Sequence, residues 1–233
     1  HLRYFGFYAS AMAQWNFTGE TAPFTNLTWI HVGSADDPAG AVRQFVERLR
    51  QADDAGVEAV LSIEPFLFTG PEGFPRSDVG IEAFLRELRE QIEAEELLDS
   101  VAMLYPKDEP FREFRRARDP NFIERYVTGE VYEDIHRDLA QVNEAIRRVF
   151  PEKPVGVILS GYEIYHNFFS IPENYDWVGF DCYDSLFDGC EGRSFAQYYG
   201  RLLAHMQPHQ RLMAIPETWA PLERLDRPDW PDV

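Results

Sequence analysis

The sequence predicts an α/β fold in which short apolar strands alternate with amphipathic helices, and three observations support this prediction. The chain has 233 residues, of which 45% are hydrophobic, enough to bury a sizeable core. Its apolar runs are short, and stretches with one apolar face separate them, which is typical of a parallel sheet covered by helices on both sides. No break in composition marks a linker, so we expect residues 1–233 to form a single domain.

The first half of the chain contains four predicted strands, Tyr4–Ala9, Leu27–Gly33, Val57–Ile63 and Val101–Tyr105. A helix begins near Pro38, after the second strand. Its candidate caps are Ser34, Asp36 and Asp37. A second helix is expected over Ile81–Leu98, because its apolar residues recur at helical spacing while arginines and glutamates take the other side.

The second half continues the alternation with three more predicted strands, Val155–Leu159, Trp177–Cys182 and Leu212–Ile215. A polar, arginine-rich stretch from Arg112 to Arg118 is typical of a loop or short helix. A long helix is expected over Val131–Ile146, and Ser194 and Gln197 form a capping box at the start of a last helix. Seven strand–helix units in one run favour a TIM-like (β/α)8 barrel over a doubly wound sheet.

The eighth strand of such a barrel is not evident. Only sixteen residues follow Glu217, too few for a covering helix and a strand. Because a gap would expose the edges of the first and seventh strands, we expect the natural chain to continue or another segment to cover the gap. The chain starts with His1-Leu2-Arg3, without an initiator Met or a signal-peptide pattern, so we expect its N-terminus to have been cut.

Charge and cysteine content restrict the partners and the compartment. A net charge of −18 argues against nucleic acid, polyanionic polysaccharides and anionic membrane surfaces as partners. No run approaches the roughly 18 consecutive apolar residues of a membrane span. Cys182 and Cys190 lie in one predicted loop, where a local disulfide and two unpaired thiols are both open. We expect a secreted or periplasmic protein, with the cytoplasm as the alternative.

Polar residues follow the predicted strands at their C-terminal ends, where barrels of this type carry active sites. They are Tyr8, Ser10, His31, Glu64, Asp108, Glu109, Ser160, Tyr162, Asp181, Tyr183, Asp184, Glu217 and Trp219. Glu109 and Glu217 stand out because they follow strands three units apart, which places them across the barrel mouth from each other. Glycoside hydrolysis uses two facing carboxyl groups. One donates a proton, and the other either attacks the sugar or activates a water molecule.

The other candidates each have a structural alternative. Glu64, before a proline, equally suits a loop carboxylate, and His31 in its apolar strand suits a hydrogen-bonded core histidine. Asp181 equally suits a helix cap or a support for the cysteine loop. Lys107 stands beside Asp108, and we expect its side chain to reach solvent, as side chains that flank strand ends usually do.

The segment Asp108-Glu109-Pro110 and the later Glu217 resemble the catalytic motifs of the barrel glycoside hydrolases of clan A. The resemblance spans nearly the whole chain at the level of strand order. It implies that Glu109 is the acid/base, that Glu217 is the nucleophile, and that Tyr183 hydrogen-bonds the nucleophile. It also implies that Trp219 is a platform for a sugar ring.

One residue departs from the family pattern. Asp108 stands where the family has an Asn that contacts the sugar 2-hydroxyl, so the family's recognition of that hydroxyl does not carry over to this position, and Asp108 is retained as a candidate substrate contact. The remaining candidate substrate contacts are His31, Asp181, Glu64 and Tyr8.

The sequence therefore predicts a glycoside hydrolase with a two-carboxylate, retaining mechanism, acting on a neutral or amino-sugar polysaccharide or oligosaccharide. No cofactor and no metal are expected. One alternative is a catalytically inactive barrel that binds carbohydrate or a protein. Another is a metal-dependent hydrolase with ligands among His31, Glu64, Asp108, Asp181 and Glu217, although no His-x-His or His-Glu-x-x-His spacing supports it. The oligomeric state is left open.

The first testable prediction concerns the two cysteines. We expect Cys182 and Cys190 to be bonded, closing a nine-residue loop. The double substitution C182S/C190S should then lower the free energy of unfolding by roughly 2–3 kcal/mol, because the bond restricts the unfolded chain. Thiol titration in denaturant without reductant should find no free thiol in the wild type. Two titratable thiols would contradict the bond.

Overall fold

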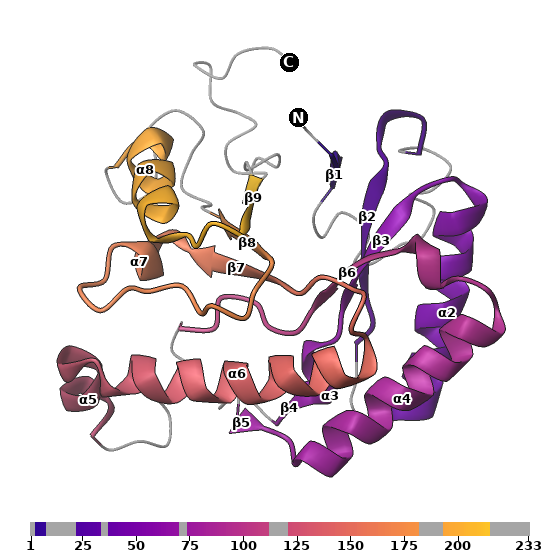
Figure 1. Cartoon of the computed structure of the whole chain (residues 1–233), viewed down its shortest axis with the longest axis horizontal. Coiled ribbons are helices and arrows are strands. Elements are labelled where there is room, and N and C mark those ends of the chain that lie inside the picture. Colours follow the sequence, from indigo (N-terminus) through magenta and orange to yellow (C-terminus); the bar gives the residue numbers. More distant parts are fainter. Residues whose placement is uncertain are drawn as a thin grey trace, which may run out of the picture.

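A computed structural model of the chain describes residues 3–7, 22–33, 37–69, 74–111, 121–181 and 193–214. Parallel strands alternate with helices along these ranges, and the strands curve around a common interior with helices on the outside (Figure 1). The predicted α/β class is therefore confirmed. The described strands do not close into a ring, so the barrel is open within these ranges.

The main strands follow one another in space in the order of the chain. They are β1 (Gly6–Phe7), β2 (Leu27–His31), β3 (Glu58–Ser62), β6 (Val101–Tyr105), β7 (Gly156–Ser160), β8 (Trp177–Asp181) and β9 (Arg211–Ala214). β1, β2, β3 and β6 form one parallel ladder, and β7, β8 and β9 form another. Two isolated parallel bridges, Leu104 with Val155 and Asp108 with Ile158, join the two ladders between β6 and β7.

The helices lie outside the strands, and two of them start at capping residues that the sequence indicates. They are α2 (Pro38–Asp54), α4 (Asp78–Ala94), α6 (Glu130–Val149) and α8 (Phe195–His205). The Asp37 carboxylate caps α2 by accepting the Gly40 N–H at 2.9 Å. Ser194 and Gln197 form the predicted capping box of α8. Figure 1 shows α2, α4 and α6 following one another around the outside of the strands, with α4 in contact with both of the others.

One predicted helix has different ends in the structure. The helix predicted over Ile81–Leu98 is α4, which begins at Asp78 behind the Ser77 cap and ends at Ala94. Two residues later, Glu96 has a positive φ of 59°, a left-handed conformation that a helix cannot continue through. A short 3-10 turn, η2 (Leu98–Ser100), then leads into β6.

Several short elements have no counterpart in the sequence prediction. They are η1 (Ala22–Phe24), α3 (Glu64–Leu67), the antiparallel pair β4 (Phe68–Thr69) and β5 (Phe74–Pro75), α5 (Phe122–Thr128) and α7 (Gly161–Ile164). Each is too short to show a hydrophobic period. α3 and α7 follow β3 and β7 directly, so they decide what stands at those strand ends.

The alternation of strand residues divides the apolar core into two parts. Residues on one face of the strands pack against the helices in the larger core, which includes Ile30, Leu61 and Phe180. Residues on the other face fill the space that the strands enclose. This inner core consists of Trp29, Val60, Met103, Tyr105 and Ile158, with Leu27, Trp177 and Met213 packed against it. Such an interior packed with side chains is typical of a barrel rather than a pore.

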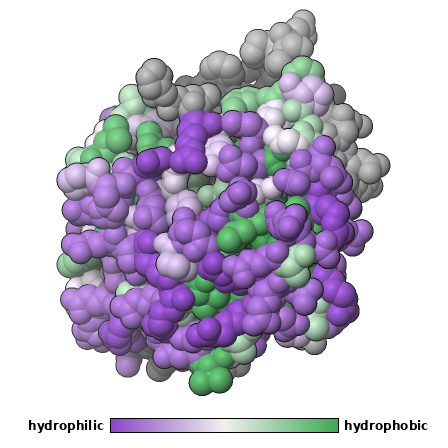
Figure 2. Space-filling model, turned by 45° about the vertical axis from the view of Figure 1, so that its right-hand side comes forward, coloured by the Kyte–Doolittle hydropathy of each residue, from purple (hydrophilic) through white to green (hydrophobic). Residues whose placement is uncertain are grey.

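The surface agrees with the composition. Figure 2 shows one face of the molecule, on which hydrophilic side chains predominate and apolar ones are interspersed. Among the described helices, none is both long enough and apolar enough to cross a membrane.

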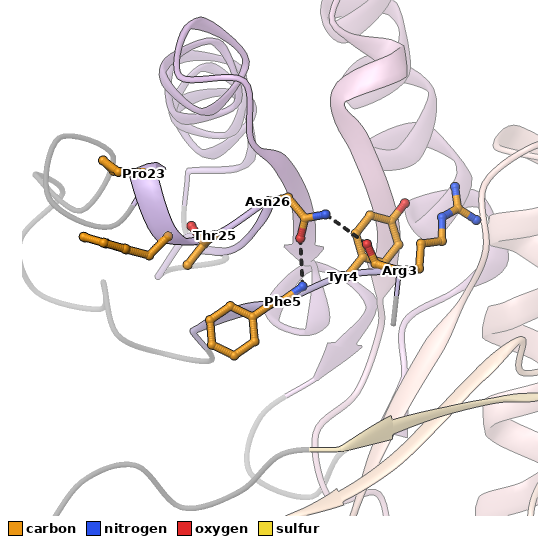
Figure 3. A pocket seen from close by; sticks show the side chains of 7 residues that line it. Arg3, Tyr4, Phe5, Pro23, Thr25 and Asn26 are labelled. Atoms are coloured by element: carbon orange, nitrogen blue, oxygen red, sulfur yellow. Dashed lines mark hydrogen bonds between the residues drawn. The ribbon is translucent and has the colours of Figure 1, made fainter. Parts of the chain in front are cut away.

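A shallow pocket lies where β1 and β2 begin, at the end of the strands opposite to the predicted site. Residues 3–5 and 23–26 line it (Figure 3). The Asn26 side chain accepts the Phe5 N–H at 2.7 Å and donates to the Arg3 carbonyl at 2.9 Å. These bonds tie the segment before β1 to the start of β2, so Asn26 serves the strand pairing.

A pair of glycine substitutions tests the close approach of β8 and β9. A Cβ at Gly179 would lie 2.8 Å from the Met213 Cβ and 2.9 Å from the Met213 carbonyl oxygen. Because a backbone atom cannot move away cheaply, Gly179→Ala should lower the free energy of unfolding by about 1–3 kcal/mol. Gly200 lies inside α8 with nothing near its added Cβ. As the matched control, Gly200→Ala should raise that free energy by roughly 0.5–1 kcal/mol. Urea unfolding measures both, and the same sign for the two variants would contradict this packing.

Candidate active site

Polar residues end neighbouring strands in one layer. His31, Ser62 and Tyr105 are in register across β2, β3 and β6, and Ser160 is in register with Asp181 across β7 and β8. Because side chains two apart on a strand share a face, these residues stand on the side of the inner core. The strand ends therefore carry a polar layer over the apolar inner core, at the C-terminal rim where the sequence predicts the site.

Glu109 lies just past β6, at the junction with β7. Its N–H donates to the Ile158 carbonyl at 3.1 Å, and the preceding Asp108 forms the bridge to Ile158. Glu109 is buried, with 9% of the residue exposed. Its φ is 37°, in the left-handed region that a residue with a side chain rarely adopts. Such strain persists only where the surroundings hold it, and it concentrates at functional sites.

The carboxylate of Glu64 binds the segment that precedes Glu109. Glu64 is the first residue of α3, directly past β3. One of its oxygens forms an ion pair with the Lys107 ammonium, and the other accepts the Asp108 N–H at 2.9 Å. The Tyr105 hydroxyl donates to the Asp108 carboxylate at 2.5 Å. The candidates Glu64 and Asp108, which follow β3 and β6, are thus brought together at adjacent strand ends.

Lys107 is buried, so the expectation that its side chain reaches solvent is wrong. Only 4% of the side chain is exposed. The Glu64 carboxylate neutralises its charge, and its ammonium lies 5.2 Å from the centre of the Phe68 ring. An ion pair and an aromatic face together compensate a cation for lost hydration, which is why the chain can bury this one.

A buried acid that the sequence analysis did not single out stands in the same region. Glu163 lies in α7, and 1% of it is exposed. One of its carboxyl oxygens accepts the Phe111 N–H at 2.6 Å, and the other accepts the Ser160 N–H at 2.6 Å. Ser160 and Glu163 form a capping box, a pattern visible in the sequence as Ser-x-x-Glu after the fifth predicted strand.

Burial raises the pKa of Glu163 to about 8. The nearby charges of Glu109 and Asp181 raise it further, whereas the N–H groups of Ser160 and Phe111 act in the opposite direction. Glu163 is therefore largely protonated at neutral pH. A neutral acid therefore lies near the carboxyl groups of Glu109 and Asp181. Its protonation reduces the electrostatic repulsion among the three groups.

Two more candidates occupy the rim. Asp181 ends β8 and is buried, with 2% exposed, and its charge acts on Glu163. His31 ends β2 half-buried, and its backbone carbonyl accepts a hydrogen bond from the Arg48 guanidinium. Burial, and then the positive charge of Arg48, lowers the pKa of His31 to about 4. The imidazole is therefore neutral at neutral pH.

The rest of the predicted site lies outside the described residues. This applies to Glu217, Tyr8, Tyr183 and Trp219, as well as to Cys182 and Cys190. The separation of the Glu109 and Glu217 carboxyl groups and the disulfide therefore stay predictions. Within the ranges that are described, no group of three or more His, Cys, Asp or Glu side chains is arranged to hold a metal ion.

Comparisons with known proteins support the fold. No protein-family model matches the sequence, and no curated protein is significantly similar to it. β-Glucuronidase 2 of Bacteroides uniformis has a similar fold, with a TM-score of 0.51 and 15% identity over 82% of this chain and 20% of that one. A second structure, of a Bacteroides uniformis β-glucuronidase, matches with a TM-score of 0.51 and 16% identity, over 82% of this chain and 20% of that chain.

An exo-β-1,4-mannosidase from an Opitutaceae bacterium matches with a TM-score of 0.47 and 12% identity, over 69% of this chain and 32% of that one. The fold of this chain is thus similar to that of the two β-glucuronidases, which are glycoside hydrolases. The chain spans about a fifth of the length of the β-glucuronidases. At such low identity, the similarity concerns the fold.

The raised pKa of Glu163 predicts how stability changes with pH. The folded chain keeps the proton up to about pH 8, whereas the unfolded chain releases it near the ordinary value of 4.5. The folded state therefore binds one more proton between these limits. Because of this group, the free energy of unfolding should be highest below about pH 4.5 and should fall by about 1.4 kcal/mol for each pH unit above it, up to about pH 8.

Glu163→Gln removes this titration. It also replaces one acceptor oxygen by a donor, so the variant should be less stable than the wild type at pH 5. The difference in unfolding free energy between the two proteins should then shrink as the pH rises toward 8, as urea titrations at several pH values would measure. A difference that stays constant from pH 5 to pH 8 would contradict a neutral Glu163.

Proposed function

We propose that this protein is a glycoside hydrolase in which Glu109 is the general acid and base. The observation that carries the proposal is the placement of Glu109. It follows the fourth strand of the parallel sheet, in a strained backbone conformation, on the rim that also holds Asp181 and the buried Glu163. The similarity in fold to glycoside hydrolases supports the same chemistry.

The nucleophile of the proposal is Glu217. β9 ends at Ala214, three residues before Glu217, and β9 is the third strand along from β6. A carboxylate carried just past β9 would therefore face Glu109 across the mouth of the strands. This placement supports the pairing that sugar hydrolysis needs, with one acid on each side of the bond that breaks.

The reaction then proceeds in two steps. Glu217 attacks the anomeric carbon while Glu109 gives its proton to the oxygen of the leaving sugar, so that a glycosyl–enzyme ester forms and the glycosidic bond breaks. Glu109, now ionised, takes a proton from water as that water attacks the same carbon. The ester breaks, Glu217 is regenerated, and the two inversions together retain the anomeric configuration.

A neutral or amino-sugar polysaccharide or oligosaccharide is the proposed substrate. The net charge of −18 repels polyanions, and Asp108 and Asp181 add acidic side chains near the proposed cleavage point. Tyr183 and Trp219, which follow β8 and β9 in the sequence, are the proposed sugar contacts beside the nucleophile.

Separate substitutions of the two glutamates test these roles. Glu109→Ala should lower kcat by about 10²–10⁴-fold on aryl glycosides with poor leaving groups, which need a proton. It should lower kcat far less on those with activated leaving groups. Glu217→Ala should abolish turnover on both kinds. Steady-state kinetics with the two kinds of substrate measures the difference.

Azide provides a stereochemical control for the same prediction. It should rescue Glu109→Ala with a product of retained configuration and Glu217→Ala with a product of inverted configuration, as NMR of the glycosyl azide would show. Equal losses on all substrates without azide rescue would mean that these roles are wrong. Wild-type protein that binds sugars in calorimetry but cleaves none of a broad glycoside panel would favour the inactive carbohydrate-binding barrel instead.

A further inference from the structure

We propose that Glu64 is a positioning residue that fixes Glu109 through Lys107 and Asp108. This inference rests on the proposed function, because it gives Glu64 a part in the proton transfer by Glu109. Glu64 does so without touching the sugar. It holds the backbone segment that carries the acid.

Both carboxylate oxygens of Glu64 bind this segment. One oxygen accepts from the Lys107 ammonium, and the other accepts the Asp108 N–H at 2.9 Å. The two partners are consecutive residues, and Glu109 is the next. A single side chain from β3 thus restrains both a side chain and a backbone group directly before the acid.

The position of Glu64 is itself fixed. The N–H of the preceding Ile63 donates to the Tyr105 carbonyl at 3.0 Å, which links the end of β3 to the end of β6. Glu64 then opens α3, where the Phe68 N–H donates to its backbone carbonyl. Its carboxylate therefore projects from a restrained backbone and not from a free loop.

The burial of Lys107 makes its contact with Glu64 difficult to break. The Lys107 side chain is 4% exposed, and the Glu64 carboxylate compensates its buried charge. The Phe68 ring, 5.2 Å from the ammonium, comes from the same segment as Glu64. Lys107 is consequently held between two residues that follow β3, and moving it away would leave a buried ion pair broken.

The contacts of Glu64 with Lys107 and Asp108 oppose the backbone strain at Glu109. The φ of 37° at this residue is unfavourable for a side chain, so the segment would relax if its restraints were removed. On the other side, the Glu109 N–H is bonded to the Ile158 carbonyl. Glu64 restrains one side of the strained residue and β7 the other, which keeps the carboxyl group where a proton can be delivered.

Leaving-group dependence separates positioning from general damage. If Glu64 positions the acid, Glu64→Ala should lower kcat by about 10²-fold on aryl glycosides with poor leaving groups, since a displacement of about 1 Å has this effect. The same variant should lower kcat only a few-fold on activated aryl glycosides, and KM should change little on either. Glu64→Gln keeps an acceptor for the Asp108 N–H but loses the charge, so its loss should be intermediate.

Matched variants complete the kinetic test. Lys107→Met alone should resemble Glu64→Ala, and Glu64→Gln/Lys107→Met, which restores neutrality, should recover part of the lost kcat. Glu87→Gln, an exposed carboxyl group of α4, is the control and should match the wild type. Equal losses on activated and unactivated substrates, or no loss for Glu64→Ala, would overturn the positioning role.

Hydrogen exchange tests, without a substrate, whether Glu64 restrains the backbone segment before Glu109. The amides of Asp108 and Glu109 are bonded to Glu64 and Ile158, so the peptide spanning residues 104–111 should exchange faster in Glu64→Ala and less so in Glu64→Gln. Unchanged exchange would overturn the inference. Failure of the proposed function looks different, because Glu109→Ala itself would then leave turnover unaffected while Glu64→Ala still accelerates exchange.

Discussion

The pairing of β6 with β7 is the constraint on which the rest of the structure depends. Each ladder is well paired internally, and within the described ranges the bridges of Leu104 with Val155 and of Asp108 with Ile158 join one ladder to the other. This junction makes one curved sheet out of two. The proposed acid stands at its C-terminal end, with its N–H bonded to Ile158 across the junction. The geometry of the site and the continuity of the sheet therefore rest on the same few hydrogen bonds.

The rim also shows how a strongly acidic chain can bury charge beside the proposed acid. Lys107 cancels one negative charge by pairing with Glu64. Glu163 avoids another by keeping its proton, while the N–H groups of Ser160 and Phe111 satisfy its oxygens. In both cases a carboxyl group at one strand end accepts a backbone N–H from a neighbouring strand end. The residues that limit the buried charge are thus also the ones that align the strand ends.

Much of the fold follows from pattern alone. The predicted fourth strand, Val101–Tyr105, is confirmed at both ends, and the capping box of Ser194 and Gln197 is where the sequence indicates it. These features depend on neighbours in the chain. The end of α4 was misplaced because the left-handed turn at Glu96 uses a residue type that gives no signal for it. The burial of Lys107 could not be predicted either, since its partner is 43 residues away.

For the site, the sequence predicted which strand ends carry acids but not how they interact. It placed Glu64, Asp108, Glu109 and Asp181 on one rim, and the structure brings them there. The sequence offered no reason to distinguish a residue that positions another residue, as we propose for Glu64, from a residue that contacts substrate. Glu163 was missed because a Ser-x-x-Glu pattern ordinarily indicates a helix start, and only the tertiary packing turns this cap into a buried neutral acid.

The chain-order arrangement of the strands has a consequence for how the protein is made. Each main strand pairs with the one synthesised just before it, so the sheet can grow from its N-terminal side as the polypeptide leaves the ribosome. Glu64 and Lys107 can meet once β6 has emerged, but the Glu109 N–H has to wait for Ile158, 49 residues later. A nascent chain arrested before β7 would hence have the contacts of Glu64 with Lys107 and Asp108 but not the hydrogen bond from Glu109 to Ile158. The proposed proton donor is therefore one of the later parts of this sheet to reach its final geometry.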